Sequence, residues 1–334
     1  MHRLRELSRS IPLQTPCDAE RPTAIALGSF DGLHPGHRRV IAAVTAPHGD
    51  GLPTVVSFWP HPREVLHGET RLRLDMPSEK VELLQPLGVR QLVMVPFDRQ
   101  LAALGPEAFV DQVLVGQLDA RRIAVGDNFR FGAGRRGTAA DLVRIGSSHG
   151  IAVIVVPMLL DGIERVSSSR IRRALAEGDL AEAERLLQRP YRFSGSVVPG
   201  RGLGRQLGWP TANLQIDGRK FLPAEGVYAA KVQCDATGPW LPAVMNLGPQ
   251  PTVDPASPSA VEVHLLDRQL ELEDRLLRVQ PLLLLRRQQR FDGLPALCAQ
   301  IAVDADRART LCAGIGMGEP PADEGCDCSQ QQNS

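Results

Sequence analysis

Residues 23–37, TAIALGSFDGLHPGH, decide the fold class of the first half of this chain. A continuous apolar run is followed by a glycine-bearing turn and then by a predicted helix. This order places the free N–H groups and the positive dipole end of a helix beyond the end of a first parallel strand, where they attract phosphate. His34 and His37 are spaced to share one face of that opening turn. An isolated H-x-x-H pair is also common on protein surfaces, so the rest of the chain must decide between the two interpretations.

Four further apolar runs follow, and each precedes an amphipathic segment. They span residues 53–59, 90–97, 121–126 and 151–157. Alternating strands and helices predict a parallel sheet with helices on both faces, and continuously apolar strands are typical of a sheet buried on both sides. We therefore predict an α/β, Rossmann-like fold, with its ligand beyond the carboxyl ends of the strands.

The pattern changes near Arg189 and Pro190. Shorter apolar runs separated by Gly, Pro and Asp turns then cover residues 193–198, 226–232, 241–248 and 260–267. Such runs predict antiparallel strands that form a small β-barrel or sandwich. A final helix is predicted over residues 294–311, where apolar residues recur at helical intervals.

These patterns divide the chain into two domains and two tails. We predict an N-terminal tail over residues 1–20, an α/β domain over 21–188, a β domain over 189–312 and a disordered tail over 313–334. A chain of 334 residues is long enough to bury two separate cores.

Composition narrows the function classes. The 38 basic and 38 acidic side chains balance, so bulk binding to nucleic acid or to an anionic membrane is not expected. The six cysteines form no C-x-x-C pair, which favours reduced thiols in the cytoplasm, and Cys326 with Cys328 offers too few ligands for a metal cage. The chain begins without an apolar signal-peptide core. Its longest apolar run, residues 151–160, is too short to span a bilayer.

Three motifs in the first half could complete a phosphate site. Residues 126–132, GDNFRFG, end a predicted strand, although GDNF is also a good turn sequence. Residues 165–172, RVSSSRIR, place three serines and three arginines at a helix start, where one serine would be a helix cap and the rest suggest a polyphosphate clamp. Residues 58–63, FWPHPR, predict a rigid loop that shapes the pocket.

The second half carries a glycine-rich loop at residues 200–214, GRGLGRQLGWPTANL. Glycines let backbone N–H groups approach phosphates closely, yet the loop lacks the ending of a Walker motif and glycine-rich hairpins are frequent. Glu262 and His264 lie in an alternating run and therefore share one face of a strand. Such a carboxylate is usually a solvated surface group, but kinase chemistry needs one that accepts a hydroxyl proton. His264 is interpreted as a structural neighbour.

The motifs FDGLHPGH, SFWPHPREVL, GDNFRFG and RVSSSRIR, in this order, resemble the adenylyltransferase module of the bacterial bifunctional riboflavin kinase/FMN adenylyltransferases. The resemblance implies that His34 and His37 contact ATP phosphates in the transition state. It implies that Asn128 helps to hold the nucleotide and the flavin phosphate, and that Arg165, Ser168 and Arg172 bind polyphosphate. It extends ATP and flavin-phosphate binding to Gly28, Phe30 and Asp31.

The segments GRQLGWPTANL, LPAEGVYAAKV, AVMNLGPQPTV and AVEVHLLD resemble the riboflavin kinase module of the same family, a small β-barrel. The resemblance implies that Glu262 takes the proton from the riboflavin 5′-hydroxyl. It also implies that Thr211 and Asn213 hold Mg²⁺ and ATP phosphates. The residues implied in binding ATP and Mg²⁺ in the kinase module are Gly200, Gly204, Arg205, Gly208, Pro210, Thr211 and Asn213.

The chain departs from the family at two places. It reads LELED over residues 270–274, where the family commonly has an acidic-Leu-Tyr-Gly turn. It reads RRQQRF over residues 286–291, where the family commonly has Arg-x-Glu-x-x-Phe, so Gln288 occupies a commonly acidic position. These changes put flavin affinity or its regulation in question more than the kinase reaction.

The resemblance covers roughly residues 21–311 and predicts two reactions: riboflavin and ATP give FMN, and FMN and a second ATP give FAD and pyrophosphate, both with Mg²⁺. One alternative is a nucleotidylyltransferase for another phosphate ester, which the PTAN and EVH segments disfavour. A second is a flavin-binding regulator without catalysis, which the two altered segments leave open. The sequence does not decide between a monomer and a homo-oligomer.

Overall fold

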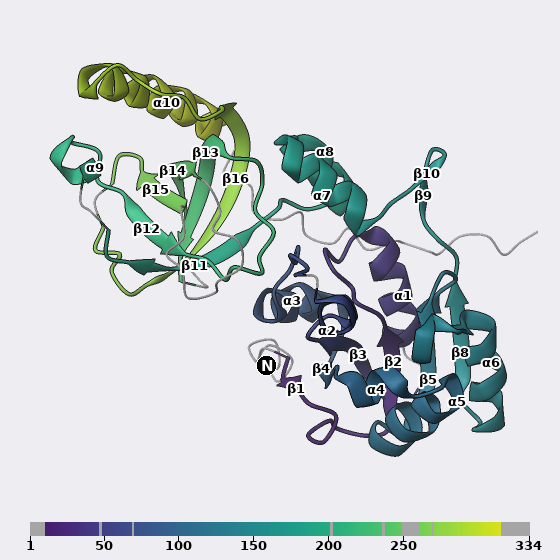
Figure 1. Cartoon of the computed structure of the whole chain (residues 1–334). Helices are drawn as coiled ribbons and strands as arrows, with labels where there is room; N and C mark the ends of the chain where they lie inside the picture. The colour runs from purple at the N-terminus through teal and green to yellow at the C-terminus, as the bar shows by residue number, and fades with distance from the viewer. Residues whose placement is uncertain are drawn as a thin grey trace, which may run out of the picture.

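The computed structural model describes residues 11–46, 49–68, 70–200, 203–235, 238–248, 261–268 and 270–314, apart from the side chains of residues 203 and 206. Figure 1 shows an α/β domain followed by a β-barrel, with two helices of the first domain, α7 (Ser168–Glu177) and α8 (Leu180–Leu187), lying between them. The change in apolar pattern near Arg189 thus lies between the end of α8 and the first strand of the barrel.

The first domain is built on a six-stranded sheet with the order β1-β4-β3-β2-β5-β8. Its strands are β1 (Leu13–Gln14), β2 (Thr23–Leu27), β3 (Leu52–Trp59), β4 (Gln91–Pro96), β5 (Ala120–Gly126) and β8 (Ala152–Val156). All neighbouring strands are parallel, which confirms the predicted sheet. Strand β1 lies within residues 1–20, the segment predicted as an N-terminal tail. A two-residue strand is too short to leave a periodic signal.

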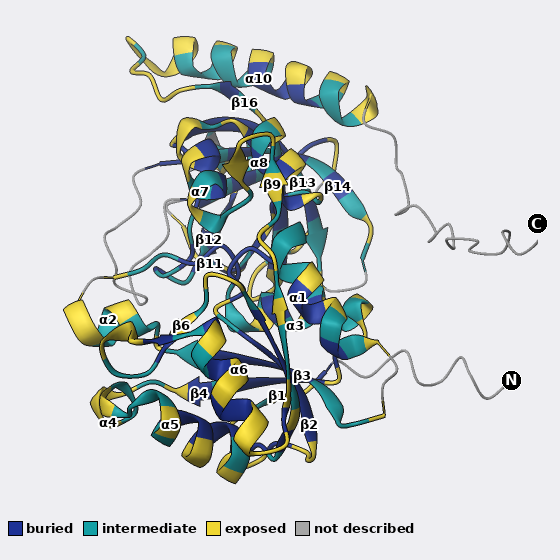
Figure 2. Ribbon diagram, turned by 90° about the vertical axis from the view of Figure 1, so that its right-hand side faces the viewer, coloured by how far each residue is buried: buried dark blue, intermediate teal, exposed yellow. Residues whose placement is uncertain are grey.

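Helices and turns cover both faces of this sheet, and Figure 2 shows the buried strands between layers with exposed outer residues. Beside α7 and α8, they are α1 (Pro35–Thr45), α2 (Pro62–His67), α3 (Pro77–Leu84), η1 (Gln85–Leu87), α4 (Arg99–Ala103), α5 (Pro106–Phe109), the π-helical η2 (Val110–Gln117), η3 (Ala133–Arg135) and α6 (Ala139–Ser148). Two separate apolar clusters form, one under α1 and one under η2 and α6. The doubly wound arrangement follows from strands that are apolar on both faces.

Two short hairpins project from the carboxyl side of the sheet. One pairs β6 (Arg130–Phe131) with β7 (Gly137–Thr138), and the other pairs β9 (Leu160–Asp161) with β10 (Glu164–Arg165). Neither was predicted, because strands of two residues carry no alternation.

The second domain is a closed antiparallel barrel with the order β11-β12-β15-β14-β13-β16. Its elements are β11 (Phe193–Val198), α9 (Leu203–Gln206), β12 (Ala212–Gln215), β13 (Gly226–Cys234), β14 (Trp240–Leu247), β15 (Val261–Leu265), β16 (Leu276–Arg286) and α10 (Leu294–Gly314). Pairing of β11 with β16 closes the barrel. The predicted barrel and final helix are therefore present, while β16 was missed because its run of leucines does not alternate.

One apolar cluster crosses the boundary between the two domains. The largest buried cluster joins Ile171, Leu175 and Leu187 of α7 and α8 to the barrel interior, and it includes Leu74 of the first domain. Apolar contact of this kind fixes the relative placement of domains more firmly than a polar interface does.

Candidate functional sites in the two domains

The two predicted histidines come together at the start of α1. Their rings stack with centroids 3.6 Å apart, and His37 also meets the ring of Phe30 edge-on at 5.4 Å. The backbone N–H of His37 donates to Nδ1 of His34 at 3.4 Å, so His34 caps the helix. An accepting Nδ1 leaves the proton of neutral imidazole on Nε2. His34 thus has a donor nitrogen at a helix N-terminus.

Both histidines are neutral in this environment. Burial and the neighbouring Arg38 lower the pKa of His34 to about 4. Burial, His34 and Lys80 lower the pKa of His37 well below its ordinary value. A phosphate group placed here would remove part of this penalty, because a nearby anion favours protonated imidazole.

The turn before the helix has an unusual backbone. Phe30 and Leu33 have φ values of 45° and 42°, and Gly32 has a φ of 92°. Non-glycine residues adopt such angles at an energetic cost that the surrounding packing must offset. The ring of Phe30 packs over Gly28, where a Cβ would lie 3.2 Å from Cζ. The predicted residues Gly28 and Phe30 therefore shape the turn.

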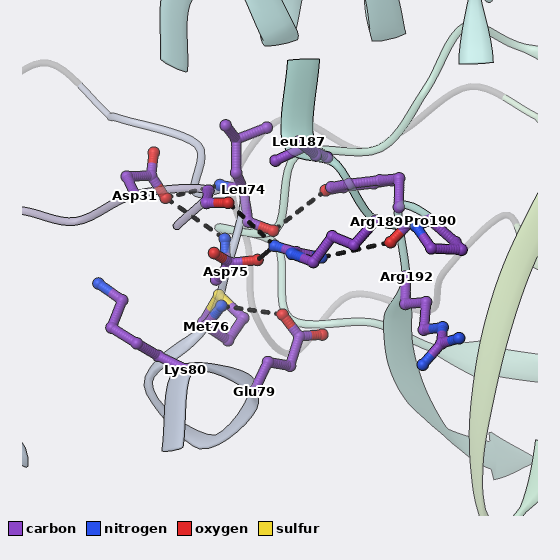
Figure 3. A network of polar contacts seen from close by, with 12 residues as sticks. Asp31, Leu74, Asp75, Met76, Glu79, Lys80, Leu187, Arg189, Pro190 and Arg192 are labelled. Atoms are coloured by element: carbon purple, nitrogen blue, oxygen red, sulfur yellow. Dashed lines mark hydrogen bonds and ion pairs between the residues drawn. The ribbon is translucent and has the colours of Figure 1, made fainter. Parts of the chain in front are cut away.

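Asp31, which was predicted to bind ATP or flavin phosphate, already has partners within the protein. Its buried carboxylate accepts the N–H groups of Leu74 at 2.9 Å and Asp75 at 3.3 Å, and it forms an ion pair with Arg172. Figure 3 shows Asp31 turned toward this segment. A carboxylate with these partners anchors the turn. One terminal nitrogen of Arg172, Nη2, therefore contacts Asp31. The other, Nη1, is buried without a hydrogen bond.

The serine and arginine cluster divides into separate roles. Ser167 caps α7, which confirms that one hydroxyl is a helix cap, and Ser168 donates to the carbonyl of Asp31 at 2.7 Å. Arg170 faces Asp161 and Glu182 at 2.7 and 2.8 Å, so it does not belong to a phosphate clamp.

Arg165 keeps an exposed position on the β9–β10 hairpin. It acts electrostatically on His34, since its charge contributes to the lowered pKa of that histidine. Of the three predicted arginines, Arg165 is thus the one most open to an incoming polyphosphate.

Residues 126–129 form the turn that their sequence favours. The N–H of Phe129 donates to the carbonyl of Gly126 at 3.0 Å, while Asp127 accepts the N–H of Met158 at 3.2 Å. Asn128 is exposed at this turn. Because β5 pairs in parallel with β2, Asn128 and the histidine turn follow neighbouring strands at the same edge of the sheet.

The loop after β3 is held from both domains, a feature that sequence reasoning missed. The ring of Trp59 is flanked by the guanidinium carbons of Arg73 at 5.1 Å and of Arg219, from the barrel domain, at 4.7 Å. Cation–π contacts of partly buried arginines stabilise such an arrangement. The predicted pocket-shaping loop therefore depends on the second domain.

A hydrogen-bonded bridge beside this loop joins the domains. The N–H of Arg73 donates to the carbonyl of Arg219 at 2.6 Å, and the N–H of Phe221 donates to the carbonyl of Arg73 at 2.7 Å. The buried ammonium of Lys220 donates to the carbonyl of Leu74 and to Glu79, each at 2.6 Å. Since Leu74 also donates to Asp31, one short segment connects the barrel to the histidine turn.

A second arginine strengthens the same segment. Arg189 forms an ion pair with buried Asp75 at 2.8 Å (Figure 3). It also donates to the carbonyl of Gly32 at 3.1 Å. Burial alone would raise the pKa of Asp75, but Arg189, Lys220 and Lys80 hold that pKa below its ordinary value. The carboxylate is therefore kept charged inside the interface.

The predicted kinase loop is described at both of its ends. A Cβ at Gly200 would collide with the side chain of Asn213, and one at Gly204 would collide with the carbonyl of Trp209. These glycines permit close packing of the loop against the PTAN segment. Thr211 is exposed and Asn213 half-buried. Of the remaining predicted loop residues, Arg205 lies within α9, and Gly208 and Pro210 follow it.

Glu262 lies in a row of polar residues across three strands of the barrel. It pairs in register with Asn213 on β12 and with Asn246 on β14. All three are half-buried, whereas their neighbours along each strand are buried, so the row lies on the outer face of the barrel. Asn246 was not predicted as a site residue, although its segment AVMNLGPQPTV was among those that resemble the riboflavin kinase module. His264 contacts the carbonyl of Pro210 at 2.7 Å through Nδ1, as a structural neighbour would.

Within the ranges that the structure describes, no three His, Cys, Asp or Glu residues gather to hold a metal ion. None of the helices in the same ranges is long and apolar enough to cross a membrane. The cysteine pair at residues 326 and 328 lies outside the described residues.

Comparisons with known proteins match both halves of the chain. The model of a family described as FAD synthetase matches residues 17–170, and that of riboflavin kinase matches residues 187–312. The bifunctional riboflavin kinase/FMN adenylyltransferase of Escherichia coli K12 is 40% identical over 299 residues, which cover 89% of this chain and 94% of that protein. This chain belongs to the bifunctional riboflavin kinase/FMN adenylyltransferase family.

A more distant relative and a solved structure also match this chain over most of its length. The protein of the same name from Listeria monocytogenes is 32% identical over 315 residues, covering 92% of this chain and 99% of that protein. A crystal structure titled macrolide-efflux protein from Streptococcus pneumoniae is 28% identical, with a TM-score of 0.77, and covers 90% of this chain and 99% of that one. Its title names a transport activity, so this likeness bears on the two-domain fold.

Proposed function

We propose that the chain makes FMN and then FAD through two separate sites. The barrel phosphorylates riboflavin with ATP, and the α/β domain joins FMN to the adenylyl group of a second ATP. Family membership over most of the chain supports the pair of reactions.

At the barrel site, the 5′-hydroxyl oxygen of riboflavin attacks the γ-phosphorus of ATP, and ADP departs. Glu262 accepts the proton of that hydroxyl. The row of Asn213, Glu262 and Asn246 supports this role, because it places a half-buried carboxylate between two amides. A carboxylate shielded from water and beside polar donors is suited to general-base chemistry.

Thr211 and Asn213 would hold Mg²⁺ at this site. Hydroxyl and amide oxygens fit the preference of this ion for hard oxygen ligands, with ATP phosphates supplying others. When bound, Mg²⁺ neutralises charge on the transferring phosphoryl group. Thr211 and Asn213 position ATP, and Gly200 and Gly204 allow the loop to pack against these two residues.

At the α/β site, a phosphate oxygen of FMN attacks the α-phosphorus of ATP, and the bond to the β-phosphate oxygen breaks to release pyrophosphate. His34 and His37 at the N-terminus of α1, with the exposed Arg165, donate to the phosphate oxygens that gain charge. Neutral histidines that become protonated as phosphate approaches stabilise this charge only when substrate is present. Asn128 borders the same edge of the sheet and orients the flavin phosphate.

The stacked histidine pair at the helix start carries this proposal. The test follows flavin products by chromatography after His34→Ala and Glu262→Gln proteins receive riboflavin, ATP and Mg²⁺. His34→Ala should accumulate FMN without FAD, and Glu262→Gln should form no FMN yet convert supplied FMN to FAD. Undiminished FAD formation by His34→Ala removes that assignment, and absence of any product from the unmodified protein favours a flavin-binding regulator.

A further inference from the structure

Two adjacent side chains of helix α3 serve different parts of the molecule. Glu79 faces the barrel, where it accepts from Lys220 at 2.6 Å. Lys80 is buried and points away from Glu79, on the side of Asp31 (Figure 3). Its Nζ donates to the backbone carbonyl of Ser29 at 2.8 Å. Lys80 is thus a buried cation that contacts the backbone of the histidine turn.

The contacted carbonyl belongs to the peptide group that joins Ser29 to Phe30. Phe30 has a φ of 45°, which the surrounding contacts must hold. Ser57 also donates to this carbonyl, at 3.3 Å, but the contact from Lys80 is shorter and comes from a charged donor, so it is the stronger restraint. The ring of Phe30 meets the ring of His37 edge-on. A donor that fixes this peptide group therefore also restrains His37.

The charge of Lys80 is not matched by a carboxylate of its own. Three carboxylates near the histidine turn each pair with a different cation: Asp31 with Arg172, Asp75 with Arg189 and Glu79 with Lys220. Among the residues that the structure describes, Lys80 forms no ion pair. Burial lowers the pKa of Lys80, and the more distant charges of Asp31 and Asp75 oppose that shift. A buried cation without an ion-pair partner is costly, and a bound phosphate would supply the missing negative charge.

We infer that Lys80 is a positioning residue for adenylyl transfer, which holds His37 through the peptide group of Ser29 and Phe30 and adds a fixed positive charge to the site. This inference rests on the proposed role of the two histidines. Lys80 is close enough to act on His37, since burial, His34 and the charge of Lys80 together lower the pKa of His37. A charge already in place stabilises phosphate oxygens in the transition state without reorganisation, so turnover depends on Lys80 more than substrate binding does.

Three substitutions at position 80 separate the hydrogen bond from the charge. Lys80→Arg keeps both a donor and the positive charge, Lys80→Gln keeps a donor without the charge, and Lys80→Met has neither. If both contributions matter, the rate of adenylyl transfer should decrease in that order. A side chain that only fills space would give similar rates in Lys80→Gln and Lys80→Met, because both are close to lysine in length.

The test measures adenylyl transfer from supplied FMN and ATP in the full-length protein. Its kcat should stay within about threefold in Lys80→Arg, fall about tenfold in Lys80→Gln and fall about thirtyfold in Lys80→Met. KM for FMN and for ATP should stay within about threefold in all three variants. Glu82→Gln is the matched control, because it removes one charge from the exposed side of the same helix, and it should leave kcat unchanged.

Riboflavin phosphorylation reports on folding in the same samples, because Lys80 lies outside the barrel. An unchanged kcat in Lys80→Met, equal losses in Lys80→Arg and Lys80→Met, equal rates in Lys80→Gln and Lys80→Met, a change in KM alone, or an equal loss of kinase activity would each overturn the inference. His37→Ala separates this inference from the proposed function. If His37→Ala keeps adenylyl transfer, the role of that histidine fails; if it abolishes transfer while Lys80→Met is silent, only the role of Lys80 fails.

Discussion

At the scale of single residues, burial determines the chemistry of the histidine turn. His34 and His37 were predicted from their spacing and from the strand that precedes them, and the structure stacks them together. The surroundings of Asp31 were not predicted, because a sequence does not reveal that its carboxylate is buried against Leu74, Asp75 and Arg172. The partners of Asp31 are distant in the chain and belong to no motif.

The lowered pKa of His34 predicts a pH dependence of stability. Between pH 6.5 and about 4 the unfolded chain binds a proton at this position and the folded chain does not. Stability therefore falls as pH falls through this window, by on the order of 3 kcal/mol from this group. Chemical denaturation at several pH values should give a flatter profile for His34→Gln. Exposed His67→Gln is the control and should retain the profile of the unmodified protein.

Gly32 offers a second test at residue scale. Its φ is 92°, and a Cβ there would lie 2.8 Å from Cδ1 of Leu74. We expect Gly32→Ala to destabilise the protein by about 1–3 kcal/mol and to lower adenylyl transfer, since the histidine turn must shift. Gly68→Ala is the matched control, because Gly68 has a φ of 65° with no atom within 4 Å of the added Cβ. Equal effects of the two substitutions would contradict the packing argument.

At the scale of elements, the pattern of apolar residues was sufficient to predict the longer strands and helices. The strands β2, β3, β4, β5 and β8 and the final helix α10 were predicted, because each leaves several apolar residues in sequence. The two-residue strands β1, β9 and β10 were not, since tertiary contacts alone form them. The GDNF segment forms the turn that its sequence favours, and the same turn exposes Asn128, a predicted site residue.

Helix α10 depends on one buried ion pair. Asp304 is 1% exposed and accepts from Arg286 at 2.8 Å. Asp304→Ala should lower the free energy of unfolding by about 3–5 kcal/mol, because it leaves the guanidinium without its buried partner. Asp306→Ala, two residues further along the same helix, removes an exposed pair with Arg309 and should cost less than about 1 kcal/mol. Denaturant titration distinguishes the two, and comparable losses would contradict a special role for Asp304.

At the scale of the whole molecule, the two candidate sites lie in domains that are joined by an apolar cluster and by hydrogen bonds. The division near Arg189 was predicted from a change in apolar pattern. The bridge between Arg73 and residues 219 and 221 was not, because it joins segments far apart in sequence without any shared periodicity. Through Leu74 and Asp31, this bridge links the barrel to the turn that holds His34.

This arrangement predicts that the barrel supports adenylyl transfer. Lys220→Met removes the hydrogen bonds to Leu74 and Glu79 and should lower adenylyl transfer by about tenfold while kinase activity stays within about twofold. Arg144→Met, at an exposed ion pair with Glu107, is the control and should change neither rate. Equal loss of both activities in Lys220→Met would indicate general unfolding, and an unchanged adenylyl transfer rate would contradict the support.

The most direct test of two independent sites in one chain is complementation between inactive variants. His34→Ala and Glu262→Gln are mixed with riboflavin, ATP and Mg²⁺, and FAD is measured over time. Neither variant alone should make FAD from riboflavin, whereas the mixture should, because the first supplies FMN and the second converts it. A mixture that forms no FAD, or either variant forming FAD from riboflavin alone, would contradict the assignment of the two reactions to these two sites.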